Sequence, residues 1–434
     1  MNKVLIALIL AVVLSGSVYA TTISEADLIL SSDNVILMTG DKKAQPLSIA
    51  ITNKKIVWVG LHKDAKNIQG TKIDFGNQAI LPGFIDAHGH ASYLAFASQV
   101  ANIASPPVGK IKTIKDLQIE LKEFIKVSNL QPGQWLIGLG YDNSLLAEQR
   151  HPTKEDLDQV STEHPIYLIH VSAHLGATNS MGLALANINS NTPDPSGGKI
   201  RRYKNSSEPN GVFEESAAYP VQQLAMSAYK DPIGSVKKAM EIYASHGITT
   251  AQDGASSPEA IALMQAADDQ GMVNLDIISY PVGQNGLDKS IQTIKFGSYK
   301  GRVKVGGIKL ILDGSPQGKT AYLTEPYYKP PHSESDSYKG YPLISQKEVS
   351  KWVSIYADLN IPIMAHANGD AAADMLIKAV KNADMKNDHR TIMIHAQTVR
   401  EDQLDQMKKL KIIPSYFSTH TFYWGDWHRD SVFG

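Results

Sequence analysis

The first part of the chain carries short stretches in which apolar and polar residues alternate. These stretches read DLILS at residues 27–31, NVILM at 34–38, LSIAIT at 47–52 and KIVWVG at 55–60. A period of two turns one strand face to a core and the other to solvent, so each stretch is predicted to be a strand. Asn53 and Lys54 are expected to form the turn between the last two. We therefore expect residues 21–79 to form a small, partial β-sandwich.

From about residue 235 the pattern changes to short apolar strands that alternate with helical stretches. The expected strands are residues 248–253, 275–281, 303–313, 361–366, 391–395 and 412–417, with residues 80–87 as the first of the set. Strands that alternate with helices are typical of parallel βα units. Seven of them predict an α/β fold, a TIM (β/α)8 barrel lacking its last strand, over residues 80–434.

A long interval separates the first barrel strand from the second. Residues 113–126 have helical periodicity, and Thr113 is expected to be the N-cap. Residues 135–142 and 165–174 are predicted to contain strands. We interpret about residues 91–235 as an insertion over the barrel mouth, because long insertions there usually shape substrate pockets.

The first twenty residues have the features of a secretory signal peptide. Lys3 supplies a positive charge, residues 4–14 are apolar, and residues 15–20 end in small residues. The apolar run is too short to span a bilayer comfortably, so no stable membrane anchor is expected after cleavage. We expect a mature chain that begins at Thr21 and is periplasmic or secreted.

Composition narrows the range of partners. The 434 residues suffice for one large domain and one small domain, and they include no cysteine. The formal net charge is −1 and 20% of residues are charged, so no basic face indicates nucleic acid as a partner. We expect a small-molecule substrate, and a homo-oligomer is compatible with the sequence.

Histidines stand at the carboxyl ends of three predicted strands. His88 and His90 follow residues 80–87, and alternation along a strand places both on one face. His366 and His395 each end an apolar strand, in the segments PIMAH and TIMIH. A single such histidine would usually be a satisfied core residue. Because the carboxyl ends of parallel barrel strands meet at one mouth, we expect these four imidazoles to converge on a metal ion.

Residues 81–90, LPGFIDAHGH, resemble the first-strand signature of the amidohydrolase superfamily of metal-dependent hydrolases. Downstream segments are similar to its branch of N-substituted formamide deformylase-like (amidohydrolase family 3) and imidazolonepropionase-like proteins, and are nearer the former. The resemblance runs from about residue 26 to the last residue. It implies a metal-dependent hydrolase-type TIM barrel and a sandwich that strands from beyond the barrel complete.

Lys309 is a further candidate ligand. In residues 308–313, IKLILD, alternation directs Lys309 and Asp313 into the barrel and three apolar residues toward the helices. A buried lysine without a partner is costly as a cation, and a neutral amine in a closed site can react with carbon dioxide. The segment is similar to the family segment whose lysine is carbamylated (a carboxylysine) and bridges two metals. The alternative is a plain ion pair between Lys309 and Asp313.

Other segments suggest where a substrate binds. Tyr141, Asp142 and His174 match segments that line the pocket in the resembling family. Trp424 lies in residues 420–428, an aromatic and polar loop that follows the seventh strand and so belongs at the barrel mouth. Packing of this loop on the insertion is an equal alternative for Trp424.

The expected ligands suit a divalent metal, zinc in our interpretation, as one ion or two. Metal-activated hydroxide would then attack an amide-type C–N bond, such as that of an N-substituted formamide or a cyclic amide. An ester, lactone or phosphotriester would suit the same hydroxide, and a non-catalytic barrel that binds metal or ligand is the alternative of another class.

The resembling family also places an aspartate at the end of strand eight, as metal ligand and proton shuttle. No aspartate here follows an eighth apolar strand, so the catalytic base is unknown from the sequence. We therefore expect a truncated chain that hydrolyses substrate at least ~10²-fold more slowly than an extended version would.

Overall fold

The computed structural model describes residues 23–40, 43–143, 145–171, 175–195, 198–227, 231–284, 295–330, 334–383, 385 and 388–434. The expected signal peptide and Thr21 lie outside these residues. The chain divides into two compact units, Met1–Phe84 and Ile85–Gly434. Within the described part of the chain, no helix has the length and apolar character needed to cross a bilayer.

The first unit is one five-stranded sheet with a short helix. Its elements are β1 (Glu25–Val35), β2 (Gln45–Thr52), β3 (Lys55–Leu61), α1 (His62–Ala65), β4 (Gln69–Asp74) and β5 (Ala79–Ile80). The strand order is β3-β2-β1-β4, and β5 extends the pairing of β1. A small apolar cluster that includes Ile29, Ala50 and Trp58 holds α1 against one face.

The predicted strands of the first unit are largely confirmed, with two differences. Asn53 and Lys54 form the turn between β2 and β3, with φ angles of 50° and 62°. The two stretches predicted at 27–31 and 34–38 form one strand, β1, which ends at Val35 and shifts register after Ser32. β4 was not predicted, because its residues are all exposed and lack an apolar face. The described residues form a single sheet here, not the two layers of a sandwich.

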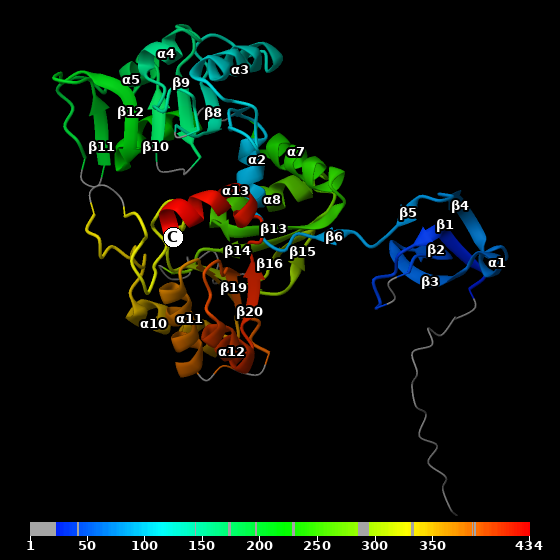
Figure 1. The fold of residues 1–434 in the computed structure, drawn as a ribbon. Helices are drawn as coiled ribbons and strands as arrows, with labels where there is room; N and C mark the ends of the chain where they lie inside the picture. The colour runs from blue at the N-terminus through cyan, green and yellow to red at the C-terminus, as the bar shows by residue number, and fades with distance from the viewer. Residues whose placement is uncertain are drawn as a thin grey trace, which may run out of the picture. The chain divides into compact units, whose positions relative to one another are not determined.

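In the second unit, the strands of the described residues follow the order expected for βα units (Figure 1). The strands are β6 (Phe84–Ile85), β13 (Ile248–Ser256), β14 (Asp276–Pro281), β16 (Val303–Val305) continued by β17 (Ile308–Ile311), β18 (Ile363–Ala367), β19 (Ile392–His395) and β20 (Ile413–Tyr416). From β13 to β20 the neighbouring strands of this series pair in parallel. Of the described residues, none pairs β20 with β6, so closure into a barrel is not seen.

The strand predicted at residues 303–313 is broken in two. Gly306 and Gly307 separate β16 from β17, and a Cβ on Gly307 would lie 2.3 Å from the carbonyl oxygen of Pro362. β16 therefore belongs to one sheet and β17 to the next. A single parallel bridge between Val282 and Lys309 joins the two sheets.

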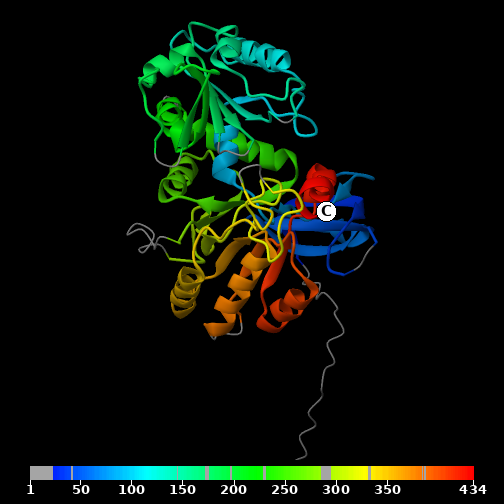
Figure 2. The same ribbon diagram turned by 60° about the vertical axis from the view of Figure 1, so that its left-hand side comes forward.

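Helices cover the strands of the second unit. They are α2 (Ala91–Ala97), α7 (Pro232–Ser245), α8 (Pro258–Asp269), α10 (Gln346–Asp358), α11 (Asp370–Asn382) and α12 (Glu401–Leu410). α10, α11 and α12 lie in a row along the β17–β20 sheet (Figure 2). Ile308, Leu310 and Leu312 pack against α10 in the largest core cluster, as the alternation of that strand predicted.

The insertion is a layered α/β structure of its own. Its six-stranded sheet has the order β11-β12-β10-β9-β8-β7. The strands are β7 (Ala101–Asn102), β8 (Leu136–Tyr141), β9 (Ile166–His170), β10 (Leu175–Thr178), β11 (Gly198–Arg202) and β12 (Pro209–Glu215). Its helices are α3 (Ile114–Val127), α4 (Lys154–Asp158), α5 (Ser180–Leu185) and α6 (Tyr219–Ser227), with a 3-10 turn at Ser216–Ala218. Thr113 caps α3 as expected, accepting a hydrogen bond from the backbone N–H of Asp116.

α2 packs on α7 and β13, so it belongs with the barrel helices.

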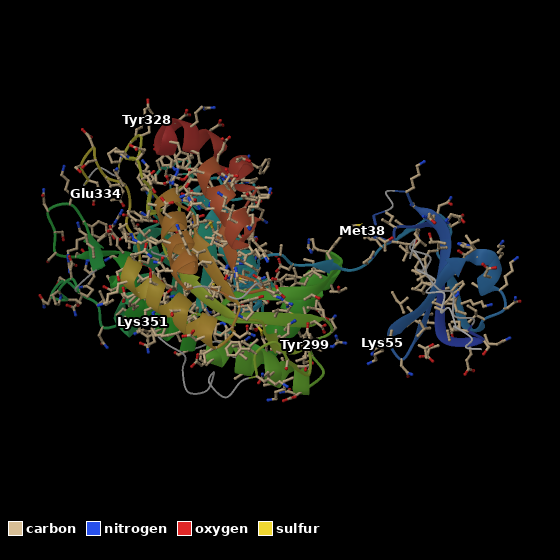
Figure 3. The ribbon with its side chains drawn as sticks, turned by 90° about the horizontal axis from the view of Figure 1, so that it is seen from below. Met38, Lys55, Tyr299, Tyr328, Glu334 and Lys351 are labelled. Carbon is tan, nitrogen blue, oxygen red and sulfur yellow. The ribbon has the colours of Figure 1, made fainter. Side chains whose placement is uncertain are left out.

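The last residues form helices where the sequence suggested a loop. α13 (His420–Trp427) continues into a π-helical turn, His428–Phe433. The turn is held by backbone hydrogen bonds from Tyr328 and Lys329 to the carbonyls of Val432 and Ser431. Tyr328 lies beside this C-terminal segment in Figure 3. The aromatic run lacks helical periodicity, which is why only tertiary contacts reveal the helix.

We predict that Leu310→Ala lowers the free energy of unfolding by about 2–5 kcal/mol, because a fully buried leucine leaves a cavity between β17 and α10. Urea unfolding followed by tryptophan fluorescence measures the change, since Trp352 packs against this core. Leu359→Ala is the matched control, because Leu359 is 57% exposed and should change stability by about 0.5 kcal/mol or less. Equal losses in the two variants would contradict this account of the core.

Candidate metal centre

His88 and His90 follow the first barrel strand, but not in the geometry expected from an extended strand. β6 covers only Phe84 and Ile85, so the residues from Asp86 onward are irregular and strict alternation does not orient them. The two imidazoles nevertheless lie together, with ring centroids 5.0 Å apart. Gly89 between them is required sterically, because a Cβ there would lie 2.0 Å from Oδ2 of Asp86.

The other two predicted histidines lie on neighbouring strands and reach the same place. His366 on β18 and His395 on β19 have ring centroids 4.6 Å apart. The ring centroid of His395 also lies 5.2 Å from that of His88, so His395 connects the two pairs of histidines. Its φ angle is 72°, in the left-handed region that non-glycine residues seldom occupy. Backbone strain of this kind is concentrated at functional sites.

Lys309 lies on β17, next to β18, and is 2% exposed. Its Nζ has no hydrogen-bond partner among the described residues. Burial lowers the pKa of Lys309 to about 7. The sequence left open an ion pair with Asp313, and the described residues do not show one. Instead, the Asp313 carboxylate accepts from the backbone N–H groups of Tyr322, Asn368 and Gly369 and lies 3.2 Å from Nδ1 of His366.

The pKa values of three histidines of the cluster, His88, His90 and His395, are lowered. Burial, together with the neighbouring Lys309, lowers the pKa of His88 to about 3 and also lowers the pKa of His90. Burial and the nearby His366 depress the pKa of His395 further. Neutral imidazoles keep a nitrogen lone pair, which is the form that ligates a metal.

The residue types suit a divalent ion, but their side chains do not surround one point as a complete set of ligands. Nε2 of His88 and Nζ of Lys309 are buried and have no hydrogen-bond partner among the described residues, so each could bind an ion. Nε2 of His366 lies 3.2 Å from the amide nitrogen of Asn368. Across the described residues, no group of three or more His, Cys, Asp or Glu side chains stands ready to hold an ion.

The predicted substrate residues are found in different places. Tyr141 ends β8 and is buried, with its hydroxyl 3.0 Å from Nδ1 of His151, and Asp142 lies near His170. Both residues contact side chains of the insertion. His174 lies outside the described residues. The ring of Trp424 contacts Phe417, whose own ring lies 6.0 Å from His395, so this tryptophan is one side chain removed from the cluster.

One residue of the cluster was not predicted. Gln252 on β13 contacts Nδ1 of His88 through its side-chain oxygen, at 2.8 Å. Gln252 is one of several polar residues in the strand 248–253, ITTAQD, and the sequence does not show which side chain it contacts.

We predict that Lys309→Met stabilises the metal-free protein in bicarbonate-free buffer, with the largest gain at or below about pH 7. The folded protein releases the Lys309 proton near its pKa of about 7, whereas the unfolded chain holds it up to about 10.5. In that window the unfolded state binds more protons, so the parent protein gains stability as the pH rises and the advantage of the variant shrinks. Urea unfolding at several pH values measures this. Lys378→Met, at an exposed lysine, should change stability little throughout.

Comparisons with known proteins identify relatives of this chain. The sequence profile described as the amidohydrolase family matches residues 71–434. The chain is 25% identical over 393 residues to N-substituted formamide deformylase of Arthrobacter pascens, which covers 87% of this chain and 70% of the relative. It is 24% identical over 398 residues to protein LONG AFTER FAR-RED 3 of Arabidopsis thaliana, covering 86% of this chain and 65% of the relative.

A solved structure shows the same fold. The crystal structure of an uncharacterized metal-dependent hydrolase from Pyrococcus furiosus aligns with a TM-score of 0.70 at 23% identity, covering 93% of this chain and 80% of the other. The fold is therefore that of amidohydrolase-type metal-dependent hydrolases. The family resemblance of residues 81–90 is confirmed by a match that spans both the histidine cluster and the insertion. The chain belongs to the amidohydrolase family.

Proposed function

We propose that this chain is a metal-dependent hydrolase that cleaves an amide-type C–N bond, in an N-substituted formamide or a cyclic amide. The single observation that carries the proposal is the buried Lys309 amine, which has a pKa lowered to about 7 and no hydrogen-bond partner among the described residues, in the barrel that also carries the four histidines. The similar deformylase from Arthrobacter pascens supports the choice of bond. Ester, lactone or phosphotriester cleavage would use the same side chains.

In this proposal His88, His90, His366, His395 and Lys309 hold one or two divalent ions, which we take to be zinc. Bound there, the ion would lower the pKa of a coordinated water toward about 7 and supply hydroxide at neutral pH. The neutral imidazoles offer lone pairs without first losing a proton.

Lys309 would join the ligand set as a carbamate. The lone pair of its neutral amine adds to the carbon of carbon dioxide, and one N–H proton leaves to solvent. The product carries an anionic carboxylate at the tip of a side chain that was a buried, unpaired amine. The negative charge would then be balanced by the ions, so the cost of burying Lys309 is removed.

A non-catalytic metal- or ligand-binding barrel is a second candidate, and one observation favours it. Neither Asp313 nor Asp426 is free and close enough to act as a base. Asp313 accepts from three backbone N–H groups. Asp426 is 91% exposed and pairs with Arg429 at 3.0 Å. Turnover of any amide by the metal-loaded protein would eliminate this candidate.

The setting of the enzyme is also proposed. The signal-like first twenty residues support export to the periplasm or the medium, and the near-neutral net charge supports a small-molecule partner.

We predict that Lys309→Ala loses one equivalent of metal and loses hydrolysis, with partial rescue by short carboxylic acids that replace the carbamate. Lys309→Arg should fail as well, because a guanidinium does not form the carbamate. Metal analysis and rates on a panel of N-substituted formamides, cyclic amides and esters measure both effects. Lys304→Ala is the matched control, since the Lys304 ammonium lies over the ring of Tyr299. Unchanged metal content in Lys309→Ala would reject the ligand role.

We predict that Trp424→Ala raises KM for amides with bulky substituents about tenfold, close to 1.4 kcal/mol, and changes KM little for small ones. The ring of Trp424 contacts Phe417 beside His395, so it can form part of a wall for an apolar group. Trp427→Ala is the control from the same helix, because Trp427 donates instead to the carbonyl of Gln317. A uniform loss across substrates would indicate that Trp424 serves packing.

A further inference from the structure

The side chain of Gln252 lies between the first barrel strand and the imidazole of His88. Gln252 belongs to β13 and is 8% exposed. Its amide nitrogen donates to the carbonyl oxygen of Ala87 at 3.1 Å, and its amide oxygen lies 2.8 Å from Nδ1 of His88. One side chain therefore holds both the backbone before His88 and the ring itself.

The orientation of this amide follows from its two partners. A backbone carbonyl can only accept a hydrogen bond, so the side of the amide that faces Ala87 must be the –NH2 group. Rotation of the amide by 180° would place two carbonyl oxygens against each other and lose that bond. The amide oxygen must therefore face His88. Because an amide oxygen also only accepts, Nδ1 of His88 must carry the proton.

The other ring nitrogen of His88 is then left with its lone pair. Nε2 is buried and has no hydrogen-bond partner among the described residues. His366 differs, because its Nε2 already has the amide of Asn368 at 3.2 Å. A close backbone also limits the ring of His88: a Cβ on Gly254 would lie 2.5 Å from its Cε1. The ring is thus held in one tautomer and has little room to rotate. Its Nε2 lone pair is free to bind a metal.

We propose that Gln252 is a positioning residue that holds His88 in the Nδ1–H tautomer and so presents Nε2 as a preformed donor to a divalent ion. The inference rests on the proposed metal-binding function, but it concerns the state of His88 before any ion binds. Without Gln252, a neutral imidazole would distribute its proton between both nitrogens, and metal binding would have to select one form. Outer partners of this kind typically contribute about 10–100-fold to metal affinity.

The first test is made on the metal-free protein with its histidines labelled with ¹⁵N. Long-range ¹H–¹⁵N spectra distinguish a protonated from an unprotonated ring nitrogen, and His88→Ala assigns the signals of His88. We expect Nδ1 protonated and Nε2 unprotonated in the parent protein. Gln252→Leu should show a mixture of tautomers, whereas Gln252→Glu, which keeps an acceptor, should retain the parent tautomer. A His88 that is protonated on Nε2 in the parent would overturn the proposal, even if no variant folded.

The second test measures zinc affinity by competition with a chelator. Gln252→Leu should weaken zinc binding about 10–100-fold, and Gln252→Glu should change it by only a few-fold. Gln118→Leu is the matched control, because Gln118 is also buried and donates to a carbonyl, that of Asp156, in the insertion. Equal affinity in the parent and Gln252→Leu would overturn the inference. A parent protein that binds no zinc would defeat the proposed function, whereas the tautomer spectra would still decide the role of Gln252.

Discussion

The burial of the Lys309 amine without a partner is the constraint on which the site depends. A charged amine is costly to bury, so burial lowers the pKa of Lys309 to about 7. The surrounding strands create this environment. The break at Gly306 and Gly307 separates β16 from β17, and the bridge from Val282 to Lys309 brings the third strand against the fourth. The joint between the two sheets therefore encloses the amine.

The histidines depend on neighbouring strands in the same way. The outer nitrogen of His88 is held by Gln252, and that of His366 by Asp313. The partner of His88 comes from the following strand, β13, and that of His366 from the end of the preceding strand, β17, so the pairing of strands decides which nitrogen faces the cluster. His395 has no such partner described, and its place is set by a left-handed backbone at the end of β19. The donors of the site are thus oriented by backbone pairing more than by contacts among themselves.

The residues proposed to bind a substrate lie in different elements from those that carry the histidine cluster. The insertion has its own sheet and its own two cores, and Tyr141 is tied to His151 inside it. α13 instead contacts the barrel strands: the ring of Trp424 packs on that of Phe417, which in turn packs on His395. The residues proposed to bind substrate thus come from two separate parts of the chain.

The sequence by itself determined the order of elements and the identity of the clustered side chains. Apolar strands that end in His366 and His395, and the alternation around Lys309, are local patterns, and they carry over to the structure because a strand's faces follow from its own residues. What the tertiary structure decided depends on residues far apart in the chain. The glycine break before Lys309, the engagement of Asp313 by backbone N–H groups and the pairing of Gln252 with His88 arise only when strands meet. The aromatic run at 420–427 became helical for the same reason, since it has no helical period and is held by residues about a hundred positions earlier.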